Sequence, residues 1–274
     1  MDLDRCFVCG SSKIRIAFTK NATDYARCES CNFLFSLQPG NPNFENTIEN
    51  FEPSYREYFE DKITDQKHAA KMLSWISTYV SMQGKRVLDV GCGSGKFVNF
   101  LRGHSINAEG VEASAPIFQE YLANVSWFTY SSVEDYVKLN HTYSAITLFD
   151  VLEHVDSPRP FLRNIWEMLE EHGWLFISTP NLSSLAARLM RKHWHFVNKY
   201  HLSLFSQKSV QILLDPLFEI KEIRTFGKYY PISYLIRYAG TFLFNRNWRI
   251  PDWVGEMHLY LNTRDTMYVA AQKR

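Results

Sequence analysis

The middle of the chain alternates between two patterns of apolar and polar positions. Five apolar runs have the length of buried strands, and apolar residues recur at helical spacing between them. The strand-like runs are 86–90, 108–113, 125–130, 144–150 and 174–179. Strands that alternate with helices indicate a parallel sheet with helices on both faces, the doubly wound α/β class. Two further runs, 217–226 and 266–273, predict the last strands.

Residues that favour helix ends mark the helices between these strands. Ser131 and Glu134 have the spacing of a capping box after the third strand. Gly173 predicts the end of the helix before the fifth strand, and Ser206 predicts the start of a later one. Apolar residues at helical spacing between 63 and 80 predict one more helix ahead of the first strand.

The chain is predicted to consist of three parts. They are a metal-binding module at 1–40, a linker with a helical lid at 41–84, and a sheet domain at 85–274 with an insertion at 231–261. Tyr55, Tyr58 and Phe59 are the aromatic residues predicted for the lid.

The insertion at 231–261 is aromatic and apolar, and it contains Arg237, Arg246 and Arg249. It could cap a bulky substrate or lie on a membrane surface. Ordinary helix packing is the favoured alternative.

The net charge and the apolar runs of the sequence indicate which kinds of partner and which cellular compartment we expect. Lys and Arg number 30 against 29 Asp and Glu, so no long-range field attracts nucleic acid, and such a partner is disfavoured. The first residues lack the basic start and apolar run of a secretory leader, and no uninterrupted apolar run reaches ~18 residues. We therefore expect a cytoplasmic protein, in which disulfides are rare.

Four of the five cysteines have the spacing of metal ligands. Cys6 and Cys9 form one C-x2-C pair, and Cys28 and Cys31 form another after eighteen residues. Two such pairs complete a tetrahedral thiolate site with no open position, so the predicted ion is a structural Zn²⁺. An unrelated set of reduced cysteines is the alternative.

The first strand runs directly into three glycines, Gly91, Gly93 and Gly95. Such a turn lets a ligand approach the backbone closely. The spacing differs from the dinucleotide fingerprint, and Lys96 is not followed by the residues of a phosphate-binding P-loop. Glu112 ends the second strand, where a carboxylate can accept hydrogen bonds from both ribose hydroxyls. These residues predict a ligand with a ribose and no need for a pyrophosphate.

Four segments resemble the successive motifs of class I S-adenosylmethionine-dependent methyltransferases. They are VLDVGCGSG, GVEAS, FDVLEHVDSP and GWLFISTPN. The sequence is most similar to the group that includes the ubiquinone-biosynthesis O-methyltransferases. The cysteine segment, followed by YREYF, resembles a zinc-binding module joined to such domains in some sugar and natural-product methyltransferases.

This resemblance implies a Rossmann-like seven-stranded sheet and S-adenosylmethionine as cofactor. The cofactor-binding residues that it implies are Asp89, Gly91, Cys92, Gly93, Gly95, Glu112, Ser132, Val133, Phe149 and Asp150. Asp89 could instead bond to the turn backbone, Phe149 could belong to the core, and Glu112 could be a solvated strand end. The implied acceptor is a small molecule or a glycan precursor, and the sequence defines neither its identity nor the oligomeric state.

Histidines are the candidate bases for the acceptor. His154 follows the fourth strand, and His201 lies in an aromatic segment after the fifth, so both could reach the same edge of the sheet. Loop anchoring is the alternative for His154, and aromatic packing is the alternative for His201. A metal site formed by His193, His195 and His201 is disfavoured because no carboxylate stands near them in the sequence.

Two other functions stay open at this point. A nucleic-acid-modifying methyltransferase could use the zinc ribbon for binding, although the net charge of +1 argues against it. A nicotinamide-dependent oxidoreductase is disfavoured by the glycine spacing.

Overall fold

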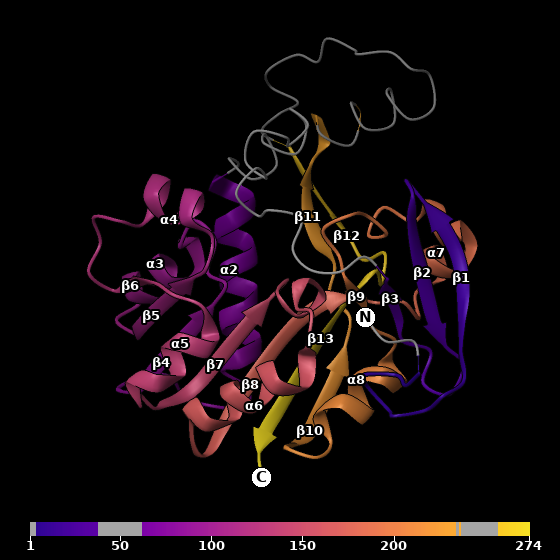
Figure 1. Ribbon diagram of the computed structural model, residues 1–274. Helices are drawn as coiled ribbons and strands as arrows, with labels where there is room; N and C mark the ends of the chain where they lie inside the picture. The colour runs from indigo at the N-terminus through magenta and orange to yellow at the C-terminus, as the bar shows by residue number, and fades with distance from the viewer. Residues whose placement is uncertain (1–3, 38–61, 234–235, 237–256) are drawn as a thin grey trace.

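The computed structural model describes residues 4–37, 62–233, 236 and 257–274. In these residues a seven-stranded sheet lies at the centre, with strand order β10-β13-β8-β7-β4-β5-β6 (Figure 1). Its strands are β4 (Arg86–Val90), β5 (Asn107–Glu112), β6 (Phe128–Tyr130), β7 (Tyr143–Phe149), β8 (Leu169–Pro180), β10 (Phe218–Arg224) and β13 (Thr266–Lys273). The strands from β4 to β8 pair in parallel, and β13 runs antiparallel to β8 and β10. The predicted doubly wound, mostly parallel fold is confirmed.

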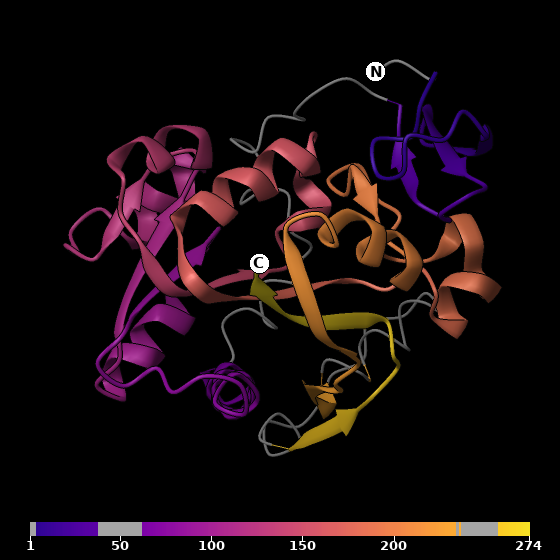
Figure 2. The ribbon, with the colours of Figure 1, turned by 90° about the horizontal axis from the view of Figure 1, so that it is seen from below.

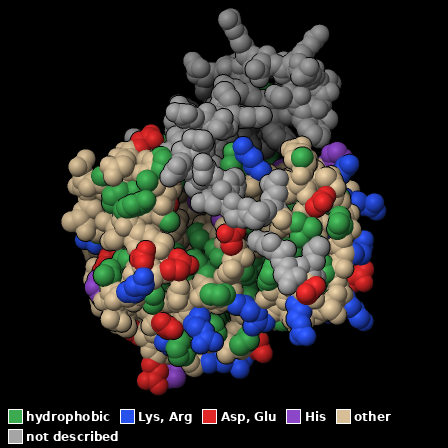
Figure 3. Space-filling view, in the orientation of Figure 1, with side chains coloured by type: hydrophobic (Ala, Val, Ile, Leu, Met, Phe, Trp, Pro, Cys, Tyr) green, Lys and Arg blue, Asp and Glu red, His purple; other side chains and the backbone are tan. Residues whose placement is uncertain are grey.

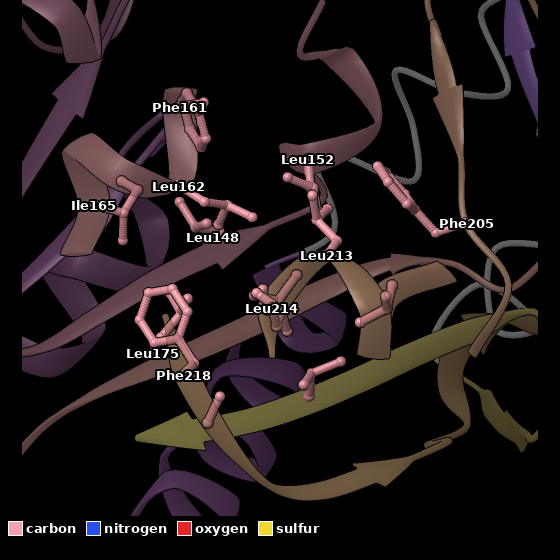
Figure 4. Packing of buried hydrophobic residues seen from close by; sticks show 14 of the residues in the cluster. Leu148, Leu152, Phe161, Leu162, Ile165, Leu175, Phe205, Leu213, Leu214 and Phe218 are labelled. Atoms are coloured by element: carbon pink, nitrogen blue, oxygen red, sulfur yellow. The ribbon is translucent and has the colours of Figure 1, made fainter. Parts of the chain in front are cut away.

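Helices cover both faces of this sheet, as the view from below shows (Figure 2). They are α2 (Lys62–Ile76), α3 (Lys96–Gly103), α4 (Ala115–Tyr121), α5 (Val133–Tyr136), α6 (Pro158–Met168), α7 (Leu185–Met190) and α8 (Gln207–Leu214). Successive residues of a strand point to opposite faces. Accordingly, Leu88 belongs to the apolar cluster with residues of α6 and α8, and Val87 belongs to the cluster with residues of α2 and α3. Leu162 and Leu213 are seen in the first cluster in Figure 4.

The helix before β8 is shorter than predicted. We expected it to end at Gly173, but α6 ends at Met168, and Leu169 already pairs with Tyr143 of β7. The pairing is irregular just beyond this point, and His172 adopts a φ of +60°. The ladder with β7 therefore overrides the helix preference of these residues.

The predicted helix caps are present in part. Ser206 accepts a hydrogen bond from the backbone N–H of Ser209, which completes a capping box at α8. The cap of α5 is Ser132 and not Ser131, because the Ser132 side chain accepts from the N–H of Asp135 at 3.2 Å. The Ser131 hydroxyl instead donates to the Ser132 carbonyl. The sequence-based prediction was therefore one residue early.

The cysteine segment forms a second sheet that includes a strand from much later in the chain. Its order is β1 (Ile14–Lys20), β2 (Thr23–Cys28), β3 (Leu34–Ser36) and β9 (Ser203–Leu204). The pairing of β3 with β9 joins the two parts of the chain. Phe33 stacks on Phe35 and contacts Phe205, with ring centroids 5.3 and 5.1 Å apart. The segment therefore packs onto the sheet domain through a shared strand and shared aromatic residues.

A two-stranded hairpin, β11 (Lys228–Pro231) and β12 (His258–Leu261), frames the predicted insertion. The aromatic residues predicted for the lid and the arginines of the insertion lie outside the described residues: Tyr55, Tyr58, Phe59, Arg237, Arg246 and Arg249. Among the helices that the structure describes, none has the length and apolar character needed to cross a membrane.

Candidate active site

The glycine turn follows β4 and is open on one side. Gly91 has a φ of +68°, and a side chain there would approach Cγ2 of Val151 to 2.6 Å. Gly93 has a φ of +55°, and nothing lies within 4 Å of the place where its Cβ would be. Glycine adopts these angles at no steric cost, whereas most residues with a Cβ are strained there. The turn therefore leaves bare backbone and space at Gly93, which is what a closely bound ligand needs.

Glu112 lies at the end of β5, and its carboxylate is fixed toward this turn. The Gly93 N–H donates to Oε2 at 2.9 Å and the Ser114 N–H donates to Oε1 at 2.8 Å. Burial raises the pKa of Glu112, and these backbone donors oppose the rise. A carboxylate has about four acceptor positions, so both oxygens can accept again. The geometry fits a ribose diol, and we call Gly91, Gly93 and Glu112 the cofactor end.

Asp89 is buried inside β4 and bonds to the neighbouring strand. The Thr147 hydroxyl of β7 donates to Asp89 Oδ1 at 2.5 Å. Burial raises the pKa of Asp89 to about 7, Thr147 opposes the rise, and the Glu112 charge adds to it. The sequence-based alternative of a bond to the turn backbone is not what the structure shows, since the partner is a side chain.

The remaining predicted cofactor residues surround this end. Cys92 packs beneath the turn, because a side chain on Gly110 would lie 2.8 Å from its Sγ. Gly95 continues the turn with a φ of +73°, and Ser132 and Val133 begin α5 after β6. These positions are consistent with contacts to the cofactor.

Phe149 and Asp150, at the end of β7, line a cavity of about 570 Å³. The Phe149 ring lies 5.2 Å from that of Phe97. Asp150 has a φ of +55°, accepts from the Ser178 hydroxyl at 2.8 Å and lies 3.7 Å from Lys228 Nζ. Partial loss of hydration acts to raise the pKa of Asp150, whose side chain is 53% exposed, but Lys228, Ser178 and the two nearby histidines lower it below its usual value. This carboxylate is therefore charged at neutral pH.

We call this cavity the acceptor end, and its walls come from distant parts of the chain. Apolar walls include Met72 of α2, Phe100 of α3 and Phe196, and polar walls include Glu153 and Lys228. In the space-filling view, hydrophobic side chains gather in the middle of the face, beside acidic ones (Figure 3). The size and lining suit a small organic molecule.

The structure brings His154 and His201 together, with ring centroids 4.9 Å apart. His154 Nδ1 lies 2.8 Å from the Tyr200 carbonyl oxygen, and His201 Nδ1 lies 2.8 Å from that of Phe196. Burial lowers the pKa of both, that of His201 to about 3. Both imidazoles are therefore neutral at physiological pH.

The sequence reasoning did not include Glu153, which completes this cluster. It is 1% exposed and accepts from the Thr179 hydroxyl at 3.0 Å. One ligand atom from each of Glu153, His154 and His201 lies within 4.8 Å of the others. The carboxylate is adjacent to His154 in sequence and 48 positions from His201, so a search near His201 alone could not find it. These three residues could hold a metal ion, which corrects the expectation that no carboxylate lies near His201. His193 and His195 are not in this cluster.

His68 of α2 also lines the acceptor end, and no sequence pattern marked it. Its Nε2 is buried without a hydrogen-bond partner. Burial, with a smaller contribution from Lys228, lowers the pKa of His68 to about 4. It adds a neutral polar group to this wall.

The four cysteines converge as the spacing predicts. Cys6 Sγ lies 3.6 Å from Cys31 Sγ, Cys9 Sγ lies 3.5 Å from Cys28 Sγ, and all four lie within 4.8 Å of one another. A tetrahedral zinc site with bonds of ~2.3 Å requires sulfur–sulfur distances of about 3.8 Å. The four residues could therefore hold a metal with little movement.

Comparisons with known proteins agree with this geometry. The family model described as "Methyltransferase domain" matches residues 61–215. A mitochondrial ubiquinone biosynthesis O-methyltransferase of Candida albicans is 34% identical over 110 residues, which cover 35% of this chain and 32% of that protein. The Burkholderia multivorans ubiquinone biosynthesis O-methyltransferase is 29% identical over 118 residues, which cover 40% and 50%. The chain thus spans half or less of the length of these relatives.

Solved structures show the same fold at low identity. A SAM-dependent methyltransferase from Archaeoglobus fulgidus has a TM-score of 0.54 at 15% identity, covering 76% of this chain and 94% of that one. The magnesium protoporphyrin IX methyltransferase of Synechocystis with bound SAH has a TM-score of 0.50 at 14% identity, covering 86% and 90%. At such identities the likeness concerns the fold.

Proposed function

Because this chain belongs to the methyltransferase-domain family, we propose that it transfers a methyl group from S-adenosylmethionine to a small-molecule acceptor. The observation that carries the proposal is the carboxylate of Glu112, which backbone donors fix beside the open turn at Gly93. The relatives named as ubiquinone biosynthesis O-methyltransferases support a small organic acceptor for this chain as well. A glycan precursor remains within the proposed substrate class.

The residues at the cofactor end fit S-adenosylmethionine, which has a ribose and an adenine and lacks phosphate. Glu112 would hold the ribose hydroxyls, and the backbone at Gly91 and Gly93 would lie beside the methionine portion. Ser132 and Val133 would contact the adenine, as the motif order implies. When bound, the cofactor supplies a methyl group already activated on a sulfonium. The chain therefore has to align the acceptor and exclude water.

The acceptor end is suited to that task. Its cavity of about 570 Å³ is lined by Phe149 and Asp150, at the end of β7, and β7 pairs with β4, the strand that leads into the glycine turn. Aromatic walls exclude water, and Asp150, Lys228 and His68 are polar groups that can orient an acceptor. We keep His154 and His201 as the candidate bases for the acceptor, because they lie beside Glu153, which lines the cavity.

We also propose a structural Zn²⁺ at Cys6, Cys9, Cys28 and Cys31. Gly10 and Asn32, the residues that follow the two pairs, have φ values of +72° and +59° and donate back to the Cys6 and Cys28 carbonyls. The turn after each pair directs its two thiolates toward a common point, where the ion would bind. Elemental analysis of protein purified without chelator should find zinc, and its absence would remove this part of the proposal.

Isothermal titration with S-adenosylmethionine and, separately, with NADH tests the cofactor. We expect binding of the former only, and the opposite result would favour the oxidoreductase alternative. Screening small phenols, nucleotide sugars and lipids for acceptor-dependent release of S-adenosylhomocysteine then tests the substrate class. Methylation of RNA or DNA in the same assay, with none of a small molecule, would favour the nucleic-acid alternative. Interspersed charges of both signs on the face in Figure 3 argue against it.

A further inference from the structure

We propose that the cysteine segment, residues 4–37, positions one wall of the acceptor end through the side chains of Lys20 and Tyr25. The wall is Phe196, which lines the cavity. Phe196 belongs to the aromatic segment, residues 194–201, which lies between α7 and β9 in the chain. In both ribbon views the cysteine segment lies beside α7, on the opposite side of the molecule from β4 and β5 (Figures 1 and 2). The proposal gives the cysteine segment a role in acceptor binding.

Two side chains of the cysteine segment bind the backbone directly after this wall. The Lys20 ammonium donates to the Val197 carbonyl oxygen at 2.6 Å, and the Tyr25 hydroxyl donates to the Asn198 carbonyl oxygen at 3.0 Å. Both carbonyls lie outside helices and strands, so no regular ladder provides their donors. A hydrogen bond from a charged ammonium is stronger than one between neutral groups. Lys20 should therefore contribute more than Tyr25.

Apolar packing fixes the same stretch of chain. Tyr25, Trp194 and Val197 are buried in one cluster, together with Leu34 of β3. The rings of Trp194 and Phe196 meet edge to face, with centroids 5.2 Å apart. Because closely packed side chains transmit a displacement to their neighbours, a shift of the backbone at Val197 would also move Phe196.

The aromatic segment connects this support to the candidate base His201. The backbone N–H of His201 donates to the side-chain oxygen of Asn198 at 3.1 Å, and His201 Nδ1 lies 2.8 Å from the Phe196 carbonyl oxygen. The rings of Phe196 and His201 stack, with centroids 5.7 Å apart. These three residues thus form one turn, and Tyr25 binds its backbone at Asn198.

The cysteine segment is itself fixed to the sheet domain, so it can act as a support. Leu34 of β3 pairs with Leu204 of β9. The Ser206 hydroxyl, at the start of α8, donates to the carbonyl oxygen of Cys31 at 2.8 Å. Strand pairing and this bond restrain the cysteine segment on the side where the aromatic segment ends.

The expected consequence concerns the acceptor and not the cofactor. Glu112 lies on β5, which is three strands from β8 in the order of the sheet, and the aromatic segment follows β8 in the chain. Loss of the support should therefore weaken acceptor binding and leave S-adenosylmethionine affinity intact. This consequence rests on the proposed function, whereas the support of the aromatic segment does not.

Hydrogen exchange of the full-length protein, without cofactor or acceptor, tests the support. Lys20→Met removes the ammonium and keeps an unbranched side chain, and Tyr25→Phe removes only the hydroxyl. In the double variant, we expect the amides of residues 194–201 to exchange roughly tenfold faster than in wild type. The amides of residues 86–95, which include the glycine turn, should exchange as in wild type.

Thr19→Val is the matched control. The Thr19 hydroxyl donates to Asp24 at 2.6 Å, so this bond lies within the same hairpin of the cysteine segment and does not reach the aromatic segment. The amides of residues 194–201 should therefore exchange at the wild-type rate in Thr19→Val.

Steady-state kinetics with the phenol, nucleotide sugar or lipid that the acceptor screen selects tests the consequence. Lys20→Met and Tyr25→Phe should each raise the acceptor KM roughly 3–10-fold, as the loss of one hydrogen bond does. The kcat and the S-adenosylmethionine affinity should change less than about threefold. Lys20→Arg keeps a charged donor and should restore most of the affinity that Lys20→Met loses. A mere loss of stability would lower the urea midpoint without raising KM alone.

Unchanged exchange of residues 194–201 in the folded double variant would overturn the proposal, and unchanged exchange in Tyr25→Phe would do so if the double variant does not fold. Equal effects of Thr19→Val and Tyr25→Phe would refute it too, because the stability of the whole hairpin would then be the cause. Faster exchange with an unchanged acceptor KM would refute the link to acceptor binding. Faster exchange with no methylation of any small molecule would contradict the proposed function and leave the support by Lys20 and Tyr25 standing.

Discussion

The cofactor end and the acceptor end of the cleft are built from the chain in different ways. The turn and the carboxylate of the cofactor end lie between Gly91 and Glu112, on two adjacent parallel strands. The acceptor end combines α2, the end of β7, the aromatic segment near Phe196 and the hairpin residue Lys228. At the cofactor end, the backbone angles of the turn determine which residue types fit. The acceptor end depends on how segments far apart in the sequence pack together.

The two ends should therefore tolerate amino-acid substitutions to different degrees. A turn with positive φ angles tolerates few sequences, so the cofactor end is tightly restricted by backbone geometry. The acceptor end depends on side chains that project from loops and a hairpin, which can change while the scaffold is kept. Substitutions at the cofactor end should therefore weaken cofactor binding, whereas substitutions at the acceptor end should lower turnover.

The largest effect is expected at the acceptor end. His154→Ala and His201→Ala should each lower turnover roughly 10²–10⁴-fold, as the loss of a general base does, and should leave S-adenosylmethionine affinity nearly intact. Steady-state kinetics with an acceptor from the screen, together with calorimetry, measures both quantities. His195→Ala is the control with near-normal turnover. Normal turnover in both variants would mean that alignment by other groups carries the reaction.

The sequence revealed the two ends unequally for physical reasons. The glycine turn and the position of Glu112 follow from local patterns, whereas the seven-stranded sheet was implied by the family resemblance. The spacing of the cysteine pairs predicted that the four thiols converge. Glu153 was missed because its partner His201 is close only after β9 and the aromatic segment fold back. His68 was missed because one histidine on a helix carries no pattern. The predicted end of α6 was too late because the pairing of Leu169 with Tyr143 of β7 is a tertiary interaction, which local helix preference does not include.

The second effect is a loss of folding stability at the glycine turn. Gly91→Ala combines a φ of +68° with an approach of 2.6 Å to the stiff Val151 side chain, and it should lower the free energy of unfolding by ~2–4 kcal/mol. Gly84→Ala is a matched control, because Gly84 has a φ of +70° and open space around it. It should cost only ~1–2 kcal/mol. Urea denaturation measures both, and equal losses would show that the contact with Val151 has no role.

The third effect concerns the affinity of the cofactor end. Glu112→Ala should weaken S-adenosylmethionine binding by ~1.5–3 kcal/mol, because it removes hydrogen bonds to a charged acceptor. Glu109→Gln, on the same strand but bonded to Arg86 and Tyr143, is the control and should leave the affinity unchanged. Calorimetry measures both. An unchanged affinity in Glu112→Ala would remove the ribose assignment and make the two ends of the cleft less distinct.

The smallest effect is a pH dependence of stability that arises beneath the glycine turn. The pKa of Asp89 is about 7 in the folded protein and near 3.8 in an exposed chain. The folded state thus holds the proton more tightly, so the contribution of Asp89 to stability is full below pH ~4 and is lost as the pH rises through about 7. Asp89→Asn cannot ionise, and it should reduce the decrease in unfolding free energy between pH 5 and 8, roughly the window of this titration. Glu112 and Glu153, whose pKa values burial also raises, should leave part of the slope in place.

Urea denaturation without cofactor across this range measures the slope, with Asp215→Asn, at a side chain 74% exposed, as the control. An identical slope in wild type and Asp89→Asn would mean that Asp89 is ionised throughout this pH range, with Thr147 and nearby groups compensating its charge. A carboxylate with a permanent negative charge would then lie beneath the glycine turn.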